Sequence, residues 1–463
     1  MTEEYDILIV GSGEAGKYLA WTMAKAGHRT ALVERKLIGG SCPNIACLPT
    51  KNVIHSAKVA SFAKRAHEFG LEGPSLATSM KGILHRKRQM VDGLVEMHLE
   101  RFKASGAELI MGNAQFTGER TVSVSLNAGG SQVLSGKRLF LNLGTRTSLP
   151  DAPGLDAAQP MTHIEALELD RLPAHLVVLG GGYIGLELAQ AFRRFGSRVT
   201  VIQRAPQLAN REDPDVGSAL LELFRDEGID VMLESAVLKV SGKSGEEIRI
   251  TVDGPGGTRA IEATDVLVAT GRTPNTQSVG LEKLGVELDS RGYIKVNERL
   301  ETTAHNVWAL GDCAGSPQFT HAAYDDFRVV SENLNGGNRS TRNRLIPSCM
   351  FTDPELVRVG LNECDAKRLG VEYRLAKMPM AAILRTRTVS EPRGFIKMLI
   401  AAHSDRILGF TAFGVDASEL LAAVQTAMLG GLDYSTLRDG IFIHPTISEG
   451  LVFLLANVPA TVH

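Results

Sequence analysis

The sequence predicts an α/β protein made of two similar halves and a smaller α+β domain near the end of the chain. The first observation is a short apolar run, Tyr5–Val10, followed at once by a glycine-rich turn and a helical pattern. The second is a repeat of the same order that begins with Leu176–Leu179. The third is a change after about residue 343 to strand-like segments followed by helical ones, which is typical of an α+β domain.

Length and composition indicate a globular protein of several domains. The chain has 463 residues, 44% of them hydrophobic and 22% charged, with a net charge of −2. The small net charge argues against nucleic acid or a membrane surface as a partner. No apolar run reaches the roughly 18–20 residues of a membrane helix, and from the acidic start Met1–Glu4 we expect no signal or transit peptide. With five cysteines, we expect a cytoplasmic location, where a disulfide is usually catalytic or sensing.

The first glycine turn has the context that dinucleotide binding requires. Gly11, Gly13 and Gly16 follow a strand and lead into a helical pattern, Lys17–Ala26. In a Rossmann-like unit, the first two glycines allow a tight turn close to a pyrophosphate, and the third lets the helix pack on the strand. The next strand ends in Glu34, 18 residues past Gly16, where a carboxylate suits the ribose hydroxyls. A tight turn without a ligand is the alternative.

Two cysteines follow this unit, in the stretch Gly39–Lys51. Cys42 and Cys47 are separated by four residues, which is close enough for a disulfide. The segment from Thr50 to about Arg65 has a helical pattern, so Cys47 lies at or near a helix N-terminus. Free amides and the positive end of the helix dipole lower a thiol pKa at such a place. The pair alone also fits two structural cysteines or a static disulfide, because its spacing is not specific.

The repeat predicts a second dinucleotide site. Gly180, Gly182 and Gly185 stand between a strand and a helical pattern. The residue 18 past the last glycine is Gln203 rather than an acid, and Arg204 follows it. A carboxylate would repel a 2′-phosphate, whereas an arginine attracts one. The pattern therefore favours NADPH over NADH, and a plain surface cation is the alternative role of Arg204.

Two more strand ends repeat between the halves. Arg138–Thr145 is a buried strand whose end carries Gly144, and Val266–Arg272 repeats it with Gly271. The remaining expectations for these halves are a long amphipathic helix with a solvated face at Ile83–Ser105, strands at Ala107–Gln115 and Thr121–Leu126, and a linker at Leu149–Leu155.

A later strand, Asn306–Asp312, ends in a glycine and an acid. Its last two residues are Gly311 and Asp312. A carboxylate at this place can accept a hydrogen bond from the polyol of a bound flavin, or it can cap a helix.

The C-terminal region carries a histidine and a glutamate at a suggestive spacing. Strands are expected at Phe395–Ala401 and Ile407–Phe413 and a helix at Ala417–Gly430. Beyond them, His444 and Glu449 are five residues apart, so the carboxylate could orient the imidazole and raise its basicity. A lone surface histidine is the alternative.

In this combination and order, the motifs resemble the flavoprotein disulfide reductases of the pyridine nucleotide family, which includes glutathione reductase, dihydrolipoamide dehydrogenase and mercuric reductase. The resemblance spans nearly the whole chain. It rests on Gly11–Gly16, Gly40–Lys51, the second glycine turn with Tyr183 and Glu187, Ala269–Arg272, Gly311–Asp312, Phe351–Glu355, and His444–Thr446 with Glu449.

The resemblance implies an FAD-binding domain made of two sequence segments, an inserted NAD(P)H-binding domain and a C-terminal domain that forms a homodimer. The corresponding boundaries are 1–150 and 279–342 for the FAD domain, 151–278 for the nicotinamide domain and 343–463 for the dimerisation domain. FAD would be bound by Gly11, Gly13, Gly16, Glu34, Lys51, Gly144, Gly311 and Asp312. NADPH, with NADH as a possible substitute, would be bound by Gly180, Gly182, Gly185, Gln203, Arg204 and Gly271.

The resemblance also implies the roles of residues near the flavin. Tyr183 would cover the ring until the nicotinamide arrives, and Lys51, paired with Glu187, would favour negative charge on the reduced ring. Electrons would then reach the Cys42–Cys47 disulfide, leaving Cys47 as the thiolate beside the flavin.

The substrate end of the relay follows from the same resemblance. Cys42 would be the interchange thiol that attacks a small-molecule disulfide. His444, held by Glu449 and reaching over from the partner subunit, would protonate the departing thiolate. Departures at Pro43 and Ala46 would shift the redox potential of the loop.

Other functions remain open. Arg204 and the run Asn210–Pro214 look most like mercuric reductase, but His444 stands where mercuric reductases tend to carry tyrosine, so we rank metal-ion reduction second. Dihydrolipoamide oxidation, and a redox-sensing subunit with slow turnover, are further alternatives. Arg385 and Arg387 could attract an anionic disulfide such as glutathione disulfide. We expect no metal site, and no role for the remaining cysteines, which are Cys313, Cys349 and Cys364.

Overall fold

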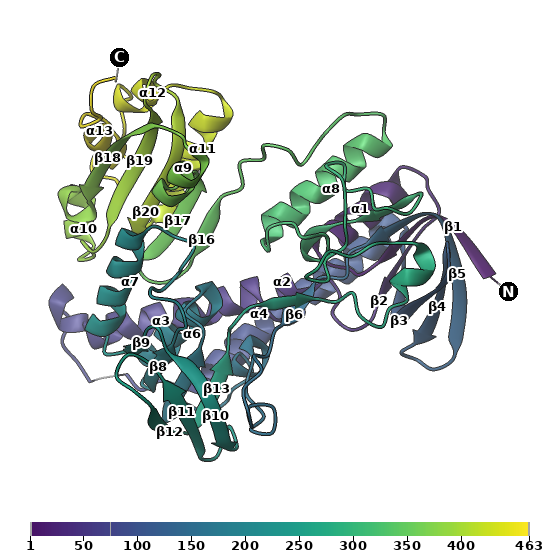
Figure 1. Cartoon of the computed structure of the whole chain (residues 1–463), viewed down its shortest axis with the longest axis horizontal. Coiled ribbons are helices and arrows are strands. Elements are labelled where there is room, and N and C mark those ends of the chain that lie inside the picture. The colour runs from purple at the N-terminus through teal and green to yellow at the C-terminus, as the bar shows by residue number, and fades with distance from the viewer. Residues whose placement is uncertain (1, 75, 462–463) are drawn as a thin grey trace.

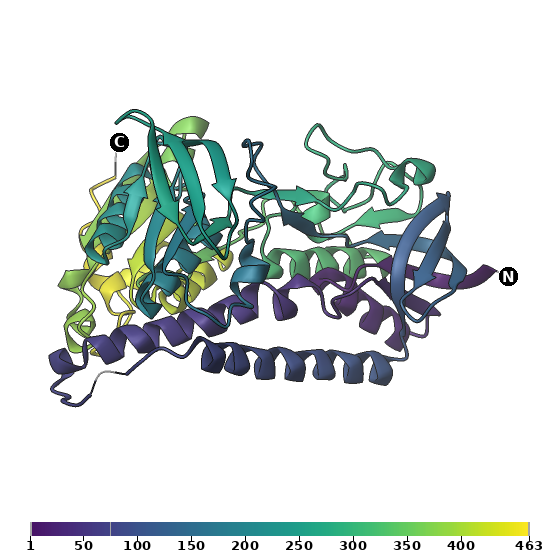
Figure 2. The ribbon, with the colours of Figure 1, turned by 90° about the horizontal axis from the view of Figure 1, so that it is seen from below.

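The computed structural model describes residues 2–74 and 76–461 and arranges them in three parts (Figure 1). The purple and blue N-terminal segments and a green segment share one side, and the teal and yellow parts adjoin each other on the other side. Two long helices, α3 (Cys47–Lys64) and α4 (Met80–Ser105), run along the length of the molecule (Figure 2). Within the described ranges, no helix is long and apolar enough to cross a membrane.

The first part is built on a six-stranded sheet. At its centre, β1 (Thr2–Val10) lies parallel between β2 (Thr30–Glu34) and β5 (Ser131–Leu141). β3 (Glu108–Gly118) continues the parallel order beside β2, and β4 (Thr121–Leu126) pairs antiparallel with β3 and β5. The apolar run of β1 is continuous because a parallel strand at the centre of a sheet is buried on both faces.

A distant segment of the chain completes this sheet. β15 (Val307–Ala309) pairs parallel with β5, so the chain returns to its first sheet after the whole second part. The short helix η3 (Gly311–Ala314) and then α8 (Thr320–Leu334) follow, and α8 lies beside α1 (Glu14–Lys25) (Figure 1). The predicted return of the chain to the first sheet is therefore present.

The second part repeats the strand, turn and helix order of the first. Its sheet has four parallel strands in the order β13-β7-β8-β9. These strands and their helices are β7 (His175–Leu179), α6 (Tyr183–Phe195), β8 (Arg198–Ile202), α7 (Pro214–Asp226), β9 (Asp230–Met232) and β13 (Asp265–Val268). An antiparallel sheet of β10 (Ala236–Gly242), β11 (Ile248–Asp253) and β12 (Arg259–Ala263) adjoins it, and β6 (Thr145–Thr147) pairs with β14 (Arg272–Pro274) where the chain enters and leaves this part.

The C-terminal part is a five-stranded antiparallel sheet covered by helices, as expected for an α+β unit. Its strands are β16 (Ser348–Met350), β17 (Glu355–Gly360), β18 (Tyr373–Pro379), β19 (Phe395–Ala401) and β20 (Ile407–Gly414). Its helices are α9 (Glu363–Leu369), η4 (Met380–Ala382), α10 (Leu384–Thr388), α11 (Ala417–Leu429), α12 (Tyr434–Arg438) and α13 (Gly450–Leu455). The remaining short helices of the molecule are α2 (Ser41–Asn44), η1 (Ala66–Phe69), α5 (His163–Ala166) and η2 (Leu281–Leu284).

Two expectations about these elements need correction, and a third is refined. The strand expected to reach Thr145 ends at Leu141, because the chain turns at Gly144, whose φ is +66°. The helical pattern read from Thr50 begins earlier, at Cys47 itself, which agrees with the expected place of Cys47 at or near a helix N-terminus. The long helix α4 is not simply solvated on its charged face, because Lys87 and His98 are buried.

A buried lysine holds the second part against the C-terminal part. Lys397 on β19 is fully buried, and its Nζ atom donates to carboxylates of Asp213, Asp215 and Glu363 over 2.7 to 3.0 Å. These three acids are spaced as metal ligands could be. The ammonium group occupies the centre of the cluster, so the acids serve as its counter-ions.

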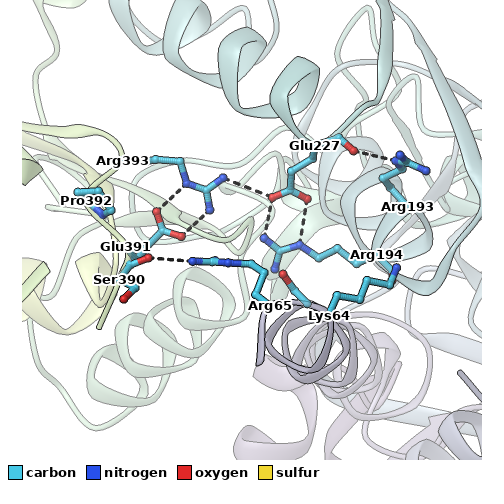
Figure 3. A pocket seen from close by; sticks show the side chains of 10 residues that line it. Lys64, Arg65, Arg193, Arg194, Glu227, Ser390, Glu391, Pro392 and Arg393 are labelled. Carbon is cyan, nitrogen blue, oxygen red and sulfur yellow. Dashed lines mark hydrogen bonds and ion pairs between the residues drawn. The ribbon is translucent and has the colours of Figure 1, made fainter. Parts of the chain in front are cut away.

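A polar junction gathers the C-terminal ends of α3, α6 and α7 (Figure 3). Lys64 Nζ donates to the main-chain oxygen of Arg194 at 2.7 Å, and Arg193 Nε donates to that of Glu227 at 2.7 Å. The Glu227 carboxylate accepts from Arg194 and faces Arg393 at 3.6 Å, beside a cavity of about 460 Å³. Helix C-termini carry partial negative charge, so these cations stabilise the junction of the three parts.

Candidate active site

The redox loop holds both cysteines on short helical turns. Cys42 lies on α2, and Cys47 is the first residue of α3. Asn44 fixes the loop between them, because its amide donates to the main-chain oxygens of Ile38 and Gly40 at 2.9 and 2.7 Å. Both cysteines are half-buried free thiols, so the structure shows the pair as a dithiol.

The two thiols have opposite acidities. The pKa of Cys47 is lowered to about 6, chiefly because the Cys42 thiol donates a hydrogen bond to it, with further help from Thr320 and the charge of Lys51. The pKa of Cys42 is raised, because its proton is held in that bond and the thiol is buried. These shifts favour the thiolate form at Cys47 and the thiol form at Cys42, in the same direction as the roles that the resemblance implies.

Thr320 is a contact that sequence reasoning missed. Its Oγ1 lies 3.2 Å from Cys47 Sγ, and it is the first residue of α8. The only signal in the sequence is the start of a helical pattern shortly after the Gly311–Asp312 turn.

Lys51 and Glu187 form the predicted ion pair. Lys51 Nζ lies 2.8 and 3.1 Å from the two carboxylate oxygens, and Glu187 is buried on α6. The main-chain N–H of Phe351 donates to the same carboxylate at 2.8 Å, and Lys51 Nζ lies 4.6 Å from the Phe351 ring centroid. Helix α3 of the first part, helix α6 of the second part and the segment after β16 therefore meet beside the redox loop.

Tyr183 begins α6 directly after the second glycine turn. Its hydroxyl donates to Glu212 Oε1 at 3.1 Å and lies 3.4 Å from Ser348 Oγ. Burial raises the pKa of Tyr183, and burial also raises the pKa of Glu212. Glu212, which the sequence did not single out, therefore fixes one position of this ring.

The first glycine turn fits a dinucleotide pyrophosphate. Gly11 has a φ of +102°, and a Cβ on it would lie 2.2 Å from the Asn142 main-chain oxygen. A Cβ on Gly13 would lie 2.6 Å from Asn142 Oδ1, which itself accepts from the Gly16 N–H at 3.1 Å. Gly13 is the N-cap of α1 and offers no side-chain cap, so the amides of Glu14 and Ala15 remain able to bind phosphate oxygens. Asn142 is a third residue that the sequence did not single out.

The acid after β2 organises the loop beside this turn. Glu34 is buried, and its Oε2 accepts from the Ser12 N–H at 2.9 Å and the Ser12 hydroxyl at 2.7 Å. Its Oε1 accepts from the main-chain N–H groups of Lys36 and Leu37 at 2.8 and 3.0 Å. These four hydrogen bonds fix the Glu34 carboxylate at the end of β2, the position where the sequence predicts an acid for the ribose hydroxyls of the dinucleotide.

Gly311 and Asp312, which follow β15, lie beside the turn that follows β5. Asp312 Oδ2 accepts from the Thr145 hydroxyl at 2.6 Å, next to Gly144. Gly311 N donates to the buried carboxylate of Asp326 at 2.7 Å, and burial raises the pKa of Asp326. The two predicted strand ends therefore meet, although 167 residues separate Thr145 from Asp312.

The second glycine turn repeats the geometry of the first. A Cβ on Gly180, whose φ is +110°, would lie 2.5 Å from the Ala269 main-chain oxygen, and Gly185 packs against Gly180. Gly182 caps α6 without a side-chain hydrogen bond, so this helix end can also take a pyrophosphate. Gly271 has a φ of +139° beside this turn.

Gln203 and Arg204 directly follow β8, at the predicted specificity position. Gln203 Oε1 accepts from the Gly181 N–H at 3.2 Å, so this amide braces the glycine turn. Arg204 is exposed, and its guanidinium carries no ion pair or hydrogen bond within the described ranges.

His444 and Glu449 form the predicted pair. His444 Nδ1 lies 2.8 Å from Glu449 Oε2, with 66% of the histidine side chain exposed and 9% of the glutamate. Among the described residues, His444 makes no hydrogen bond or ion pair with either redox cysteine of the same chain. Arg385 and Arg387 are exposed on α10; Cys313 is buried, Cys349 is half-buried and Cys364 is exposed.

Comparison with known families accounts for this combination of sites. Residues 5–326 match the family model described as pyridine nucleotide-disulphide oxidoreductase, and residues 346–454 match the dimerisation domain of that family. The chain belongs to the pyridine nucleotide-disulfide oxidoreductase family. Its C-terminal part is therefore the family's dimerisation domain, which indicates a homodimer.

Individual members of the family are similar over nearly the full length. The chain is 36% identical to the probable pyridine nucleotide-disulfide oxidoreductase RclA of Escherichia coli, covering 98% of this chain and 99% of RclA. It is 32% identical to a Staphylococcus aureus mercuric reductase, covering 97% and 81% of the two chains. The solved structure titled HOCl-induced flavoprotein disulfide reductase RclA from Escherichia coli superposes with a TM-score of 0.89 at 35% identity, over 98% of this chain and 100% of that one.

These findings make the chain a flavoprotein disulfide oxidoreductase that uses FAD and a pyridine nucleotide. Bound FAD supplies the acceptor for hydride from the nicotinamide and the donor of electrons to a disulfide. The two glycine turns fit one dinucleotide each, because both present uncapped helix ends and leave no room for a Cβ at their first glycine.

Proposed function

We propose that this enzyme passes electrons from NADPH through FAD to Cys42 and Cys47 and from there to a small-molecule disulfide. The observation that carries this proposal is the unequal pair: the pKa of Cys47 is lowered and the pKa of Cys42 is raised. Such a pair can keep one sulfur as a stable thiolate while the other exchanges with a substrate.

The exchange follows from the chemistry of the pair. Cys42, once deprotonated, attacks one sulfur of the substrate disulfide, and the substrate S–S bond breaks as one thiolate leaves. The Cys47 thiolate then attacks Cys42 Sγ, re-forming the Cys42–Cys47 bond and releasing the second thiolate. Two electrons leave with the two product sulfurs. The proton lost by Cys42 supplies one product thiol, and solvent supplies the proton of the other. Lys51 and Glu187 would position the flavin side of this relay, and Tyr183 would cover it.

We propose the same assignment of residues to FAD and to NADPH that the resemblance implies. FAD would lie on Gly11, Gly13, Gly16 and Glu34 and along Gly144, Gly311, Asp312 and Lys51. NADPH would lie on Gly180, Gly182, Gly185 and Gly271, with Gln203 and Arg204 at the adenosine ribose. The preference for NADPH is supported by the exposed Arg204 guanidinium, which no carboxylate neutralises within the described ranges.

A proton donor for the leaving thiolate would come from the partner subunit. His444 is exposed beside Ile441 and Ile443, which are also largely exposed. An apolar stretch of this kind in a dimerisation domain suits burial against a second copy. We therefore propose that His444, oriented by Glu449, completes the active site of the other subunit.

We also propose the division into domains. Residues 1–150 and 279–342 would form the FAD-binding domain, residues 151–278 the NAD(P)H-binding domain and residues 343–463 the dimerisation domain. The proposed location is the cytoplasm, which suits a dithiol held reduced.

Metal-ion reduction is the second candidate. One similar crystal structure is titled a Cu(II) complex of RclA, at 35% identity, and several similar proteins are mercuric reductases. A reduced pair with one thiolate could pass electrons to a soft metal ion as substrate.

Steady-state turnover separates these candidates. The FAD-loaded enzyme and Cys42→Ser would be assayed with NADPH against glutathione disulfide, lipoamide and other small disulfides, and against Cu(II) and Hg(II). We expect at least one disulfide to be reduced by the wild type and by Cys42→Ser at less than about 1% of that rate. Turnover with a metal ion and with no disulfide would contradict the first proposal and support the second.

A further inference from the structure

The N-terminal ends of two helices, α3 and α8, lie beside the sulfur of Cys47. Cys47 is the first residue of α3, and Thr320, 273 residues later, is the first residue of α8. Thr320 Oγ1 lies 3.2 Å from Cys47 Sγ. Neither helix has a side-chain cap at its N-terminus, so the first-turn amides of both retain their partial positive charge.

We propose that Thr320 is a positioning residue that holds Cys47 as the thiolate of the reduced pair, by donating its hydroxyl hydrogen to Cys47 Sγ. The inference deepens the proposed relay and rests on it. A hydroxyl is suited to this role because it does not titrate in the physiological range, so it remains a donor at every working pH.

The groups around Cys47 show why a second donor matters. The Cys42 thiol on α2 donates to Cys47, Lys51 on α3 attracts the thiolate, and Glu187 on α6 opposes it. Cys42 loses its S–H when it attacks a substrate, because its sulfur is then bonded to the substrate sulfur. In the dithiol, Thr320 interacts with both sulfurs, and during that mixed disulfide its hydroxyl hydrogen is left to the Cys47 thiolate.

A donor to the thiolate also affects the redox balance of the pair. Reduction of the Cys42–Cys47 bond takes up two electrons and one proton when it yields a Cys42 thiol and a Cys47 thiolate. A hydrogen bond to the thiolate stabilises the reduced form and therefore raises the reduction potential. Thr320→Val, which keeps the shape but removes the donor, is expected to make this potential more negative.

The test uses the FAD-loaded protein in a Cys42→Ser background, which leaves one thiol in the site. The rate of Cys47 alkylation by iodoacetamide would be followed by peptide mass spectrometry from pH 4.5 to 9.5. Thr320→Val is compared with Thr320→Ser, which retains the hydroxyl. The midpoint of the rise in alkylation rate with pH reports the pKa of Cys47. We expect Thr320→Val to raise this midpoint by about one pH unit and Thr320→Ser to leave it within about 0.3 units of the Cys42→Ser parent.

Two results would overturn the inference. One is an unchanged midpoint in Thr320→Val, and the other is an equal shift in both variants, which would assign the effect to packing. Flavin content and circular dichroism would be compared first, to show that each variant is folded. Because the midpoint is measured without nucleotide or substrate, it is independent of whether a disulfide is the physiological acceptor.

Discussion

Lys51 Nζ lies 2.8 Å from one carboxylate oxygen of Glu187 and 3.1 Å from the other. The carboxylate is 4% exposed and the lysine 33%, so the pair lies at the edge of the interior. Because Glu187 also accepts the Phe351 N–H, one carboxylate sets the position of Lys51 relative to α6 and the C-terminal part. This geometry supports the proposal that Lys51 presents a fixed positive charge to the flavin.

Removing the charge of Glu187 should slow flavin reduction more than it affects folding. In Glu187→Gln, an amide oxygen can still accept from Phe351, but Lys51 loses its counter-ion and its fixed position. We expect the rate of flavin reduction by NADPH in anaerobic stopped flow to fall by about tenfold or more. Glu222→Gln, an exposed acid on α7, is the matched control and should leave the rate unchanged. Equal rates in both variants would remove Glu187 from the relay.

The pH dependence of the reduction potential should report the thiolate. The pKa of Cys47 is lowered to about 6, so the ionised form is present above that pH and is lost as the pH falls through it. Reduction of the pair then takes up two protons below pH 6 and one above it, since Cys42 stays protonated near neutrality. The potential should fall by about 59 mV per pH unit below the break and about 30 mV above it. A single slope of 59 mV up to pH 8 would contradict the assignment.

Nucleotide preference should depend on Arg204. Replacing the guanidinium with a carboxylate in Arg204→Glu should weaken NADPH binding by about 10- to 100-fold and change NADH binding little, because only NADPH carries the 2′-phosphate. The dissociation constants of both nucleotides would be obtained from the dependence of the flavin reduction rate on nucleotide concentration in anaerobic stopped flow. Arg211→Glu, an exposed arginine nearby, is the control. Equal weakening of both nucleotides in Arg204→Glu would remove the phosphate argument.

The sharing of the active site between subunits can be tested with mixed dimers. Neither Cys42→Ser nor His444→Ala should reduce disulfides alone. If each site combines Cys42 of one subunit with His444 of the other, every mixed dimer contains one intact site. Random mixing of the two variants should then restore about one quarter of the wild-type activity. No recovery, with mixed dimers shown by mass spectrometry, would place both residues in the same subunit's site.

The buried Lys397 should dominate the stability of the contact between the second and C-terminal parts. Lys397→Met fills similar volume but leaves three carboxylates without their counter-ion. Breaking a buried ion cluster in this way costs about 3–5 kcal/mol, so the unfolding temperature should fall by several degrees. Lys103→Met, on the exposed face of α4, should change it little. An unfolding temperature equal to that of the control would show that the cluster contributes no net stability.

The residues themselves predicted those parts of the site that lie within one local element, whereas the pair of Lys51 and Glu187, 136 residues apart, was implied by the resemblance to the family. The glycine turns, the start of a helix at Cys47 and the pairing of His444 with Glu449 follow from short spacings, because a strand, turn and helix unit has a fixed local geometry. The apolar runs of β1 and β7 likewise reported burial on both faces of a parallel sheet.

The missed residues are those whose roles arise from contacts across the fold. Thr320 meets Cys47 across 273 residues and Asn142 meets Gly16 across 126, and no periodicity in the chain encodes such contacts. Glu212 lies in the run Asn210–Pro214, which the sequence showed only as a likeness to mercuric reductase, yet it is buried against Tyr183. Only the folded arrangement of the parts brings these groups together.

The central claim is that electrons from NADPH reach Cys42 and Cys47. The oxidised, FAD-loaded enzyme would be mixed anaerobically with one equivalent of NADPH per subunit, quenched with an alkylating agent and analysed by peptide mass spectrometry. We expect both cysteines to become alkylated together after NADPH and neither before it, while Cys313, Cys349 and Cys364 do not change. Flavin reduction without the appearance of these two thiols would contradict the account.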